Sequence, residues 1–508
     1  SADLVARQYD FESWAELQVA NSAEREPDRD STRNPVTAPP FYRIDTRKNT
    51  IEPRPPLTST DWDAIFAIMK ERGITGIRTA AVTDDVMARL ARLDFVTEVG
   101  LGGAQGLTDD GLLRLSEMPQ LERLDLSGWH SPVTDRGLEV LRHLPSLRGF
   151  SLEWAQRVTD AGAANLSSCE HLEEVDLMGT PTGDGALRAL GGKSQLGKLG
   201  TGKPVTDNGL LLLHDMRGFK TWRGERIEYD LMWFGAGTGG LLLDGSFTDR
   251  GLASLEGLDG LASLQLFWHS RNFTSEGIAA LANVANLGYL GCQGELCDDA
   301  AMRSIATLPN LRMLMAQGTV ASDDGLIALS HSTSLQYLWG RQCPNLSGRG
   351  FSALADLETL RGLGVSCKLV DDAALGSLPR FPSLRELMPM DVPDAGFRHV
   401  GACEGLETLW CMYCRDTGDE VTEHIAGLRL KQYYAGSTKI TDRSLELLGH
   451  MTSLEKLEFA QIAAITDSGI ASLAKLPRLR EISIFSAPRV TRKGVDTFVP
   501  DVRVDYQT

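Results

Sequence analysis

Two cysteines stand three residues apart in the segment LETLWCMYC, which runs from Leu406 to Cys414. A C-x-x-C pair can bind zinc or exchange disulfides, but a structural zinc site needs four ligands, usually two such pairs. The nearest other cysteines in the chain are Cys403 and Cys367. The sequence therefore favours Cys411 as a packed core thiol and Cys414 as a turn residue over a metal or redox site. No cofactor is predicted.

Three other patterns suggest chemistry and have simpler interpretations. GAGTGG, Gly235–Gly240, contains G-x-G-x-x-G, but a strand-like LLLDGSFTD follows instead of the helix that a dinucleotide site requires. His130 and His269 each follow a tryptophan, yet they lie about five repeats apart and cannot share a metal. Acidic doublets recur where each repeat begins its helix, where negative charge caps the N-terminus: Asp109–Asp110, Asp298–Asp299, Asp323–Asp324 and Asp371–Asp372. We predict no catalytic residue.

The element that must position all these residues is a repeat of 22 to 26 residues. LERLDLSGWHSPVTDRGLEVLRHLPS from Leu121 is followed by similar units from Leu147 and Leu172, and the pattern continues to Leu479. The L-x-x-L-x-L part alternates as a short strand does, and VTDxGLxxL carries leucines on one face of a helix. One strand and one helix cannot bury their apolar faces alone, whereas stacked units can.

These units resemble leucine-rich repeats, over about residues 74–506. CEGLETLWCMYC (Cys403–Cys414) is similar to the cysteine-containing subtype of F-box substrate receptors, and VTDxGLxxL to bacterial repeat proteins. The resemblance implies an α/β solenoid, a horseshoe with parallel strands on the concave face and helices on the convex face. It also implies a binding role. An F-box is not found in the N-terminal region, although ARQYDFESWAEL resembles a segment of bacterial ankyrin-repeat proteins.

The concave positions of the repeat change character along the chain. In L-x-x-L-x-L-x, alternate strand residues face away from the core. Early units place polar residues there, such as Arg123, Asp125 and Glu174. Later units place large apolar groups and one arginine there, and contiguous apolar patches usually mark binding sites. The predicted site comprises Phe267, Tyr289, Met313, Met315, Tyr337, Trp339, Arg341, Met388, Met390, Trp410, Met412 and Tyr434.

Two alternatives bear on this site. The step from Phe219 to Leu261 is longer than one repeat, which indicates an insertion at about residues 223–240. This insertion carries the apolar stretch LMWF and can therefore fold over the apolar patch. The N-terminal segment is a second candidate for covering the patch. Alternatively, a slip of register in the weak repeats would turn the predicted surface into core.

The predicted organisation has five parts: a short N-terminal helix (1–20), a linker (21–56), a cap with a first degenerate repeat (57–95), repeats (96–501) and a C-terminal stub (502–508). The net charge of −17 disfavours nucleic acid and anionic membranes as partners. No apolar run is long enough to span a bilayer. The scattered cysteines and the absence of a signal-like N-terminus indicate a cytoplasmic protein, or a secreted one if a signal was removed.

We therefore predict a non-enzymatic scaffold that binds a protein or peptide through the aromatic and methionine-rich concave face. A rival interpretation is a protein or enzyme that encloses a hydrophobic small molecule beneath the insertion. A third is a bacterial effector or ubiquitin-ligase-type adaptor, by analogy with the repeat subtype.

Overall fold

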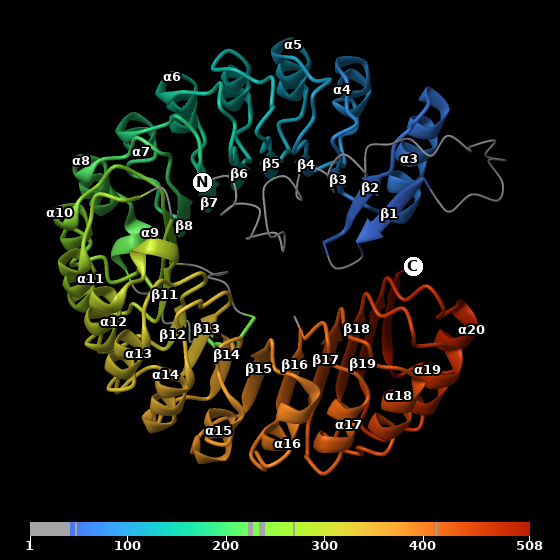
Figure 1. Cartoon of the computed structure of the whole chain (residues 1–508). Coiled ribbons are helices and arrows are strands. Elements are labelled where there is room, and N and C mark those ends of the chain that lie inside the picture. The colour runs from blue at the N-terminus through green and yellow to red at the C-terminus, as the bar shows by residue number, and fades with distance from the viewer. Residues whose placement is uncertain are drawn as a thin grey trace.

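The computed structural model describes residues 41–45, 48–221, 227–232, 239–267, 270–412 and 414–507. Over these ranges twenty strands form a single curved sheet, and short helices line its outer side, so that the chain makes a nearly closed horseshoe (Figure 1). The predicted α/β solenoid with strands inside and helices outside is confirmed. None of the described helices is both long and apolar enough to cross a bilayer.

The strands are three to five residues long. They are β1 (Tyr42–Asp45), β2 (Thr50–Pro53), β3 (Gly76–Arg78), β4 (Glu98–Gly100), β5 (Arg123–Asp125), β6 (Gly149–Ser151), β7 (Glu174–Asp176), β8 (Lys198–Gly200), β9 (Gly240–Leu243), β10 (Ser263–Leu266), β11 (Tyr289–Cys292), β12 (Met313–Met315), β13 (Tyr337–Gly340), β14 (Gly362–Ser366), β15 (Glu386–Met390), β16 (Thr408–Cys411), β17 (Gln432–Gly436), β18 (Lys456–Ala460), β19 (Glu481–Phe485) and β20 (Arg503–Gln507).

The outer elements alternate with these strands. The α-helices are α3 (Ser59–Arg72), α4 (Asp84–Leu90), α5 (Asp109–Leu112), α6 (Asp160–Ala163), α7 (Asp184–Ala189), α8 (Asp207–Leu211), α9 (Arg217–Lys220), α10 (Asp249–Ala253), α11 (Ser275–Ala280), α12 (Asp299–Ala306), α13 (Asp323–Leu329), α14 (Gly348–Ala353), α15 (Asp372–Leu375), α16 (Phe397–Val400), α17 (Glu420–Ile425), α18 (Asp442–Leu448), α19 (Asp467–Leu473) and α20 (Arg492–Val495). The 3₁₀ turns are η1 (Leu113–Glu117), η2 (Gly137–His143), η3 (Ala164–Ser168), η4 (Leu212–Asp215), η5 (Leu281–Asn283), η6 (Gly294–Leu296), η7 (Leu354–Asp356), η8 (Leu378–Arg380) and η9 (Asp394–Gly396).

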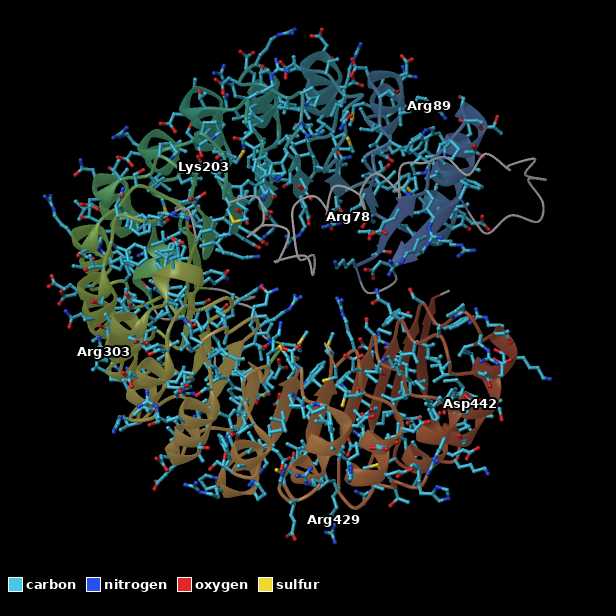
Figure 2. The ribbon with its side chains drawn as sticks, viewed as in Figure 1. Arg78, Arg89, Lys203, Arg303, Arg429 and Asp442 are labelled. Atoms are coloured by element: carbon cyan, nitrogen blue, oxygen red, sulfur yellow. The ribbon has the colours of Figure 1, made fainter. Side chains whose placement is uncertain are left out.

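The parallel register stacks equivalent residues of successive repeats. Leu290 of β11, Leu314 of β12 and Leu338 of β13 pair in line, and all three are buried in the main core between the sheet and the helices. Side chains at the alternate positions face the hollow of the horseshoe. Arg78 lies on that inner side, whereas Arg303 and Arg429 project outward from the convex side (Figure 2).

The N-terminal end of the sheet differs from the sequence prediction. β1 and β2 lie within the predicted linker and pair with each other in an antiparallel arrangement, and β2 pairs in parallel with β3. Ile51 of β2 is fully buried and covers the end of the repeat core. The prolines around the segment suggested a linker, but the exposed apolar end of a solenoid needs a cap. Helix α3 follows, with Trp62, Ile65 and Met69 buried.

At the C-terminal end, the residues predicted as a stub contain β20, which pairs in parallel with β19.

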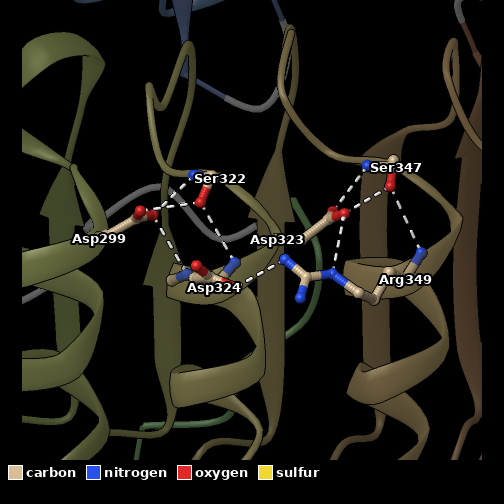
Figure 3. Close-up of polar contacts among 7 residues, drawn as sticks. Asp299, Ser322, Asp323, Asp324, Ser347 and Arg349 are labelled. Carbon is tan, nitrogen blue, oxygen red and sulfur yellow. Dashed lines mark hydrogen bonds and ion pairs between the residues drawn. The ribbon is translucent and has the colours of Figure 1, made fainter.

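The acidic doublets connect neighbouring repeats as well as capping helices. Ser322 caps α13, while the carboxylate of Asp299, one repeat earlier, accepts hydrogen bonds from the Ser322 amide at 2.7 Å and from its hydroxyl at 2.8 Å (Figure 3). Asp323 does the same for Ser347. The capping interpretation holds for Asp298 and Asp371, which cap α12 and α15. Asp109–Asp110 and Asp323–Asp324 also lie at helix starts, in the first turns of α5 and α13, although the N-cap residues themselves are Thr108 and Ser322.

This inter-repeat contact explains the glycine at the fourth position of the T-D-x-G motif, which is kept also in repeats such as Ser347–Gly350 where the second residue is not aspartate. A Cβ added to Gly350 would lie 2.5 Å from the Oδ1 atom of Asp323. The same clash with the aspartate of the preceding repeat occurs at Gly137 and Gly277. The motif is therefore a physical unit: threonine or serine caps its own helix, aspartate holds the next repeat, and glycine leaves room for the previous aspartate.

Candidate binding surface on the concave face

The register places the predicted site residues in rows across the inner face of the sheet. Tyr289, Met313 and Tyr337 pair in one row through β11, β12 and β13. Met315 and Trp339 pair in the adjacent row. Further along, Trp410 of β16 pairs with Tyr434 of β17. The prediction that these side chains lie on the face opposite the core leucines is confirmed, and the register did not slip.

Seven of these side chains, together with Leu231 of the insertion, form an apolar cluster separate from the main core. We call this cluster the concave patch. Its buried members are Tyr289, Met313, Met315, Tyr337, Trp339, Met388 and Met390, together with Leu231 of the insertion, and Tyr229, Met232, Trp410 and Met412 pack against it half-buried.

The sequence predicted that the patch faces solvent, and for its buried members this is wrong. Tyr289, Met313 and Met388 are at most 1 % exposed, and Trp339 is 6 % exposed. The described part of the insertion, residues 227–232, lies against them, and Leu231 is itself fully buried among them. The physical reason is that a row of uncovered Trp, Tyr and Met side chains is costly in water. The alternative in which the insertion covers the patch therefore describes this structure.

Two glycines of β14 make room for Leu231. They occupy concave positions between β13 and β15: Gly362 pairs with Tyr337, and Gly364 pairs with Trp339 on one side and Met388 on the other. A Cβ on Gly362 would clash with the Tyr337 ring and lie 3.1 Å from Leu231 Cδ2. A Cβ on Gly364 would lie 3.0 Å from Trp339 Cδ1 and 3.7 Å from the same Leu231 atom. The patch thus contains a notch of about one leucine side chain, which we call the leucine notch.

Two further contacts fix the insertion segment. The backbone N–H of Leu231 donates to Glu386 Oε2 at 3.2 Å. The Tyr229 hydroxyl lies against Gly288, where a Cβ would collide with it. Burial raises the pKa of Tyr229 to about 12. Burial also raises the pKa of Glu386 to about 7, against the opposing effect of the Leu231 hydrogen bond, and nearby Asp230 and Glu407 add to the rise.

Trp410 and Tyr434 extend the patch toward β17. Their rings stack in parallel, with centroids 3.7 Å apart and planes 6° apart. The Tyr434 hydroxyl donates to Gln432 Oε1 at 2.6 Å. Both side chains are half-buried, so this end of the patch is the part most accessible to a partner.

Two predicted residues do not join the patch. Phe267, which directly follows β10, is buried beside Trp154, with ring centroids 5.8 Å apart. Arg341 follows β13 and is half-buried, and it is not part of the apolar cluster.

An aromatic cluster near Phe267 was missed by the sequence reasoning. Trp129 and Trp154 stack with centroids 4.5 Å apart, and the Lys203 Nζ atom lies over both rings at 5.6 and 5.5 Å. The available signal was the tryptophan that follows the strand in two consecutive repeats.

The early repeats line a polar pocket, which includes the polar concave residues that the sequence placed there. Its charged residues are Arg78, Glu98, Arg123, Asp125, Glu153, Glu174, Asp176 and Lys198. Burial, and then the neighbouring Asp176 carboxylate, raise the pKa of Glu153 to about 8. Glu153 is therefore protonated near neutral pH and donates a hydrogen bond to Asp176. Within the described ranges, no three His, Cys, Asp or Glu residues come together as a set that could hold a metal ion.

The C-x-x-C cysteines are packed, as the sequence favoured. Cys411 and Cys414 are 1 % and 2 % exposed. The Cys414 thiol donates to the Pro389 carbonyl at 3.2 Å. Burial raises the pKa of Cys414 to about 12 and that of Cys411 well above its usual value. Such thiols are poor nucleophiles and poor metal ligands. His269, Tyr413 and most of GAGTGG lie outside the described residues, although β9 does begin at Gly240.

One parallel strand and one outer helix or turn in each short repeat, stacked into a curved single sheet, define a leucine-rich-repeat horseshoe solenoid. No protein-family model and no curated protein sequence matches the chain. Solved structures do match it. An internalin (inlF) from Listeria monocytogenes is 15% identical, with 84% of this chain and 94% of that chain covered and a TM-score of 0.29.

Two further solved structures are similar in the same way. TLR13, in a complex with ssRNA13, is 15% identical over 84% of this chain and 65% of that chain, with a TM-score of 0.46. A chain of the yeast Rad7 and Elc1 complex is 14% identical over 88% and 92%, with a TM-score of 0.37. Because every TM-score is below 0.5, the fold assignment rests on the register of this chain, and the likenesses carry no argument about its partner. The expectation that nucleic acid is not a partner stays a prediction.

Proposed function

We propose that this protein is a non-enzymatic binding scaffold that recognises a protein or peptide segment through the concave patch. One observation carries the proposal: a short segment of the chain's own insertion already lies in the patch, with a leucine in a notch of matching size. The patch therefore has the shape and chemistry to hold a peptide segment.

The side chains of the patch favour contact over catalysis. They are thioether and aromatic groups, which supply a large contact area, and methionine adapts to irregular partners. Trp410, stacked on Tyr434 and half-buried, is the aromatic anchor most accessible to a partner. Trp339, deeper in the patch, forms one wall of the leucine notch.

The experiment is affinity capture with wild-type protein and the Trp339→Ala/Trp410→Ala variant. We expect the variant to lose a partner that the wild type retains. Trp129→Ala is the matched control, because it removes a 44 % exposed tryptophan that is not a member of the concave patch. Circular dichroism of all three proteins shows whether the fold is kept. If the folded double variant captures the same partner as strongly as the wild type, the patch is not the binding site.

A second candidate function has its own supporting observation. The insertion covers the patch, and this arrangement suits a lid over a hydrophobic small molecule. Native mass spectrometry of the purified protein tests this: a bound small molecule adds a defined mass, which the Trp339→Ala/Trp410→Ala variant should lose. A mass equal to that of the bare chain, in protein purified without detergent, contradicts the enclosed-ligand function.

A further inference from the structure

The geometry points to an internal ligand: we propose that residues 227–232 hold the concave patch in a closed state, and that the partner displaces them with a segment of the same chemistry. That chemistry is a leucine, preceded two positions earlier by an aromatic residue and followed by a flexible apolar residue, as in Tyr229–Asp230–Leu231–Met232. The inference rests on the proposed binding function and names the class of segment that the patch selects.

The leucine notch is the first argument, because it is a specific seat. Glycine within a strand weakens the strand and is retained where another group approaches closely. β14 has glycine at two successive concave positions, Gly362 and Gly364, and Leu231 Cδ2 lies near the Cβ position of both. At Gly362 a methyl group would already crowd the leucine, whereas at Gly364 only a side chain that extends beyond Cβ would reach it. The leucine notch therefore selects an aliphatic side chain that approaches the sheet from its concave side.

The second argument is that side-chain anchors and one backbone hydrogen bond to a side chain hold the described segment, rather than a strand pairing. Leu231 is buried, and its N–H donates to Glu386. Tyr229 and Met232 are half-buried, while Glu228 and Asp230 are exposed. No strand pairing joins the described residues 227–232 to the sheet. A partner that reproduces these anchors and adds contacts along the patch can compete with the segment, because a ligand shifts such an equilibrium by its differential affinity.

The third argument is that the patch continues beyond the segment. Trp410 and Met412 are half-buried and pack against the cluster around Leu231, and Tyr434 stacks on Trp410 one strand further along the sheet. A partner longer than the internal segment would contact this aromatic pair as well as the leucine notch. The extra area gives the partner its advantage over the internal ligand.

The test uses the full-length chain and a fluorescently labelled peptide, IEYDLM, with the sequence of residues 227–232. A Tyr229→Ala/Leu231→Asp variant removes both side-chain anchors of the internal segment. We expect the peptide to bind this variant at least ten-fold more tightly than the wild type, where the internal segment competes. The peptide IEYDDM, in which aspartate replaces the leucine, should not bind.

A second variant tests the leucine notch itself. Adding Gly362→Ala to the Tyr229→Ala/Leu231→Asp background should abolish peptide binding, because the added methyl group would lie 3.1 Å from the Cδ2 position of the seated leucine and would also collide with the Tyr337 ring beside it. Gly427→Ala, where a Cβ meets nothing within 4 Å, is the matched control and should leave binding unchanged. Equal peptide binding by the wild type and the Tyr229→Ala/Leu231→Asp variant, with both folded, would overturn the internal-ligand proposal.

Partner capture separates this inference from the proposed function. If the segment is displaceable, the Tyr229→Ala/Leu231→Asp variant should capture several-fold more partner than the wild type. Unchanged or reduced capture, together with loss of capture in the Trp339→Ala/Trp410→Ala variant, would overturn the internal ligand and leave the binding patch intact. If the Trp339→Ala/Trp410→Ala variant captured as much partner as the wild type, the proposed function would be overturned. The assignment of residues 227–232 as the segment that competes with the partner would then fall as well.

Discussion

The Asp323 carboxylate accepts a hydrogen bond from the backbone amide of Ser347 at 2.9 Å and another from its hydroxyl, and so joins the start of α13 to the start of α14 (Figure 3). Burial tends to raise the pKa of Asp323, but the hydrogen bonds from Ser347 and Gly350 lower it overall. The same contact recurs along the solenoid, for example from Asp109 to Thr134 and from Asp442 to Thr466.

The first prediction concerns this contact. Asp323→Ala leaves the Ser347 amide without its acceptor and should lower the free energy of unfolding by about 1–2 kcal/mol. Asp324→Ala is the matched control: that neighbouring carboxylate is exposed and pairs only with the surface guanidinium of Arg349 among its described ion pairs. Its loss should change stability by less than about 0.5 kcal/mol. Chemical denaturation measures both, and equal effects would mean that the inter-repeat contact adds nothing.

The second prediction concerns the glycine of the motif. Gly350→Ala places a methyl group against Asp323 and should cost about 1–3 kcal/mol through overpacking. Gly427→Ala, in open space, should be neutral or slightly stabilising. Denaturant midpoints of the two variants give the comparison. A Gly350→Ala protein as stable as the wild type would contradict the steric account of the T-D-x-G motif.

The third prediction concerns the cysteines. All eight are free and buried, and burial raises the pKa of Cys169, Cys343, Cys367 and Cys403 as well as that of the C-x-x-C pair. We expect no thiol to react with a disulfide reagent on the minute scale in native protein at pH 8, and all eight to react in denaturant. Fast reaction of Cys411 or Cys414 with the disulfide reagent in the native state would contradict this prediction and support a redox role for the C-x-x-C pair.

The fourth prediction is a pH dependence from the polar pocket. The folded pKa of Glu153 is about 8, above its ordinary value of 4.5, because burial and Asp176 disfavour its ionised form. Between these two values the folded state holds a proton that the unfolded state has lost, so the Glu153 contribution to stability falls as pH rises from about 4.5 to about 8.

Glu153→Gln removes this titration while keeping a hydrogen-bond donor toward Asp176. The melting temperature of the wild type should therefore drop more between pH 5 and pH 8.5 than that of the variant. Glu139→Gln, at an exposed position, is the control and should follow the wild type. Parallel pH profiles for the wild type and Glu153→Gln would show that Glu153 is not protonated in the folded protein.

The sequence by itself determined the repeat, and with it the horseshoe, because the units carry alternating leucines for a strand and T-D-x-G or a variant of it for a helix start. The alternation also placed Tyr337, Trp339 and Trp410 on the concave face, since strand side chains alternate regardless of what surrounds them. The cysteines at 411 and 414 were assigned to core and turn by the same frame.

Only the tertiary structure decided what covers that face. Leu231 and Glu386 are 155 residues apart in the chain, and no local pattern reports that the Leu231 amide meets the Glu386 carboxylate or that Gly362 and Gly364 leave a notch for the leucine. Likewise, the partner of each motif aspartate lies one repeat further on and becomes visible only when the repeats are stacked. Periodicity fixes which face a side chain occupies, because it is a property of one strand. Burial of that face depends on the segments that fold across it.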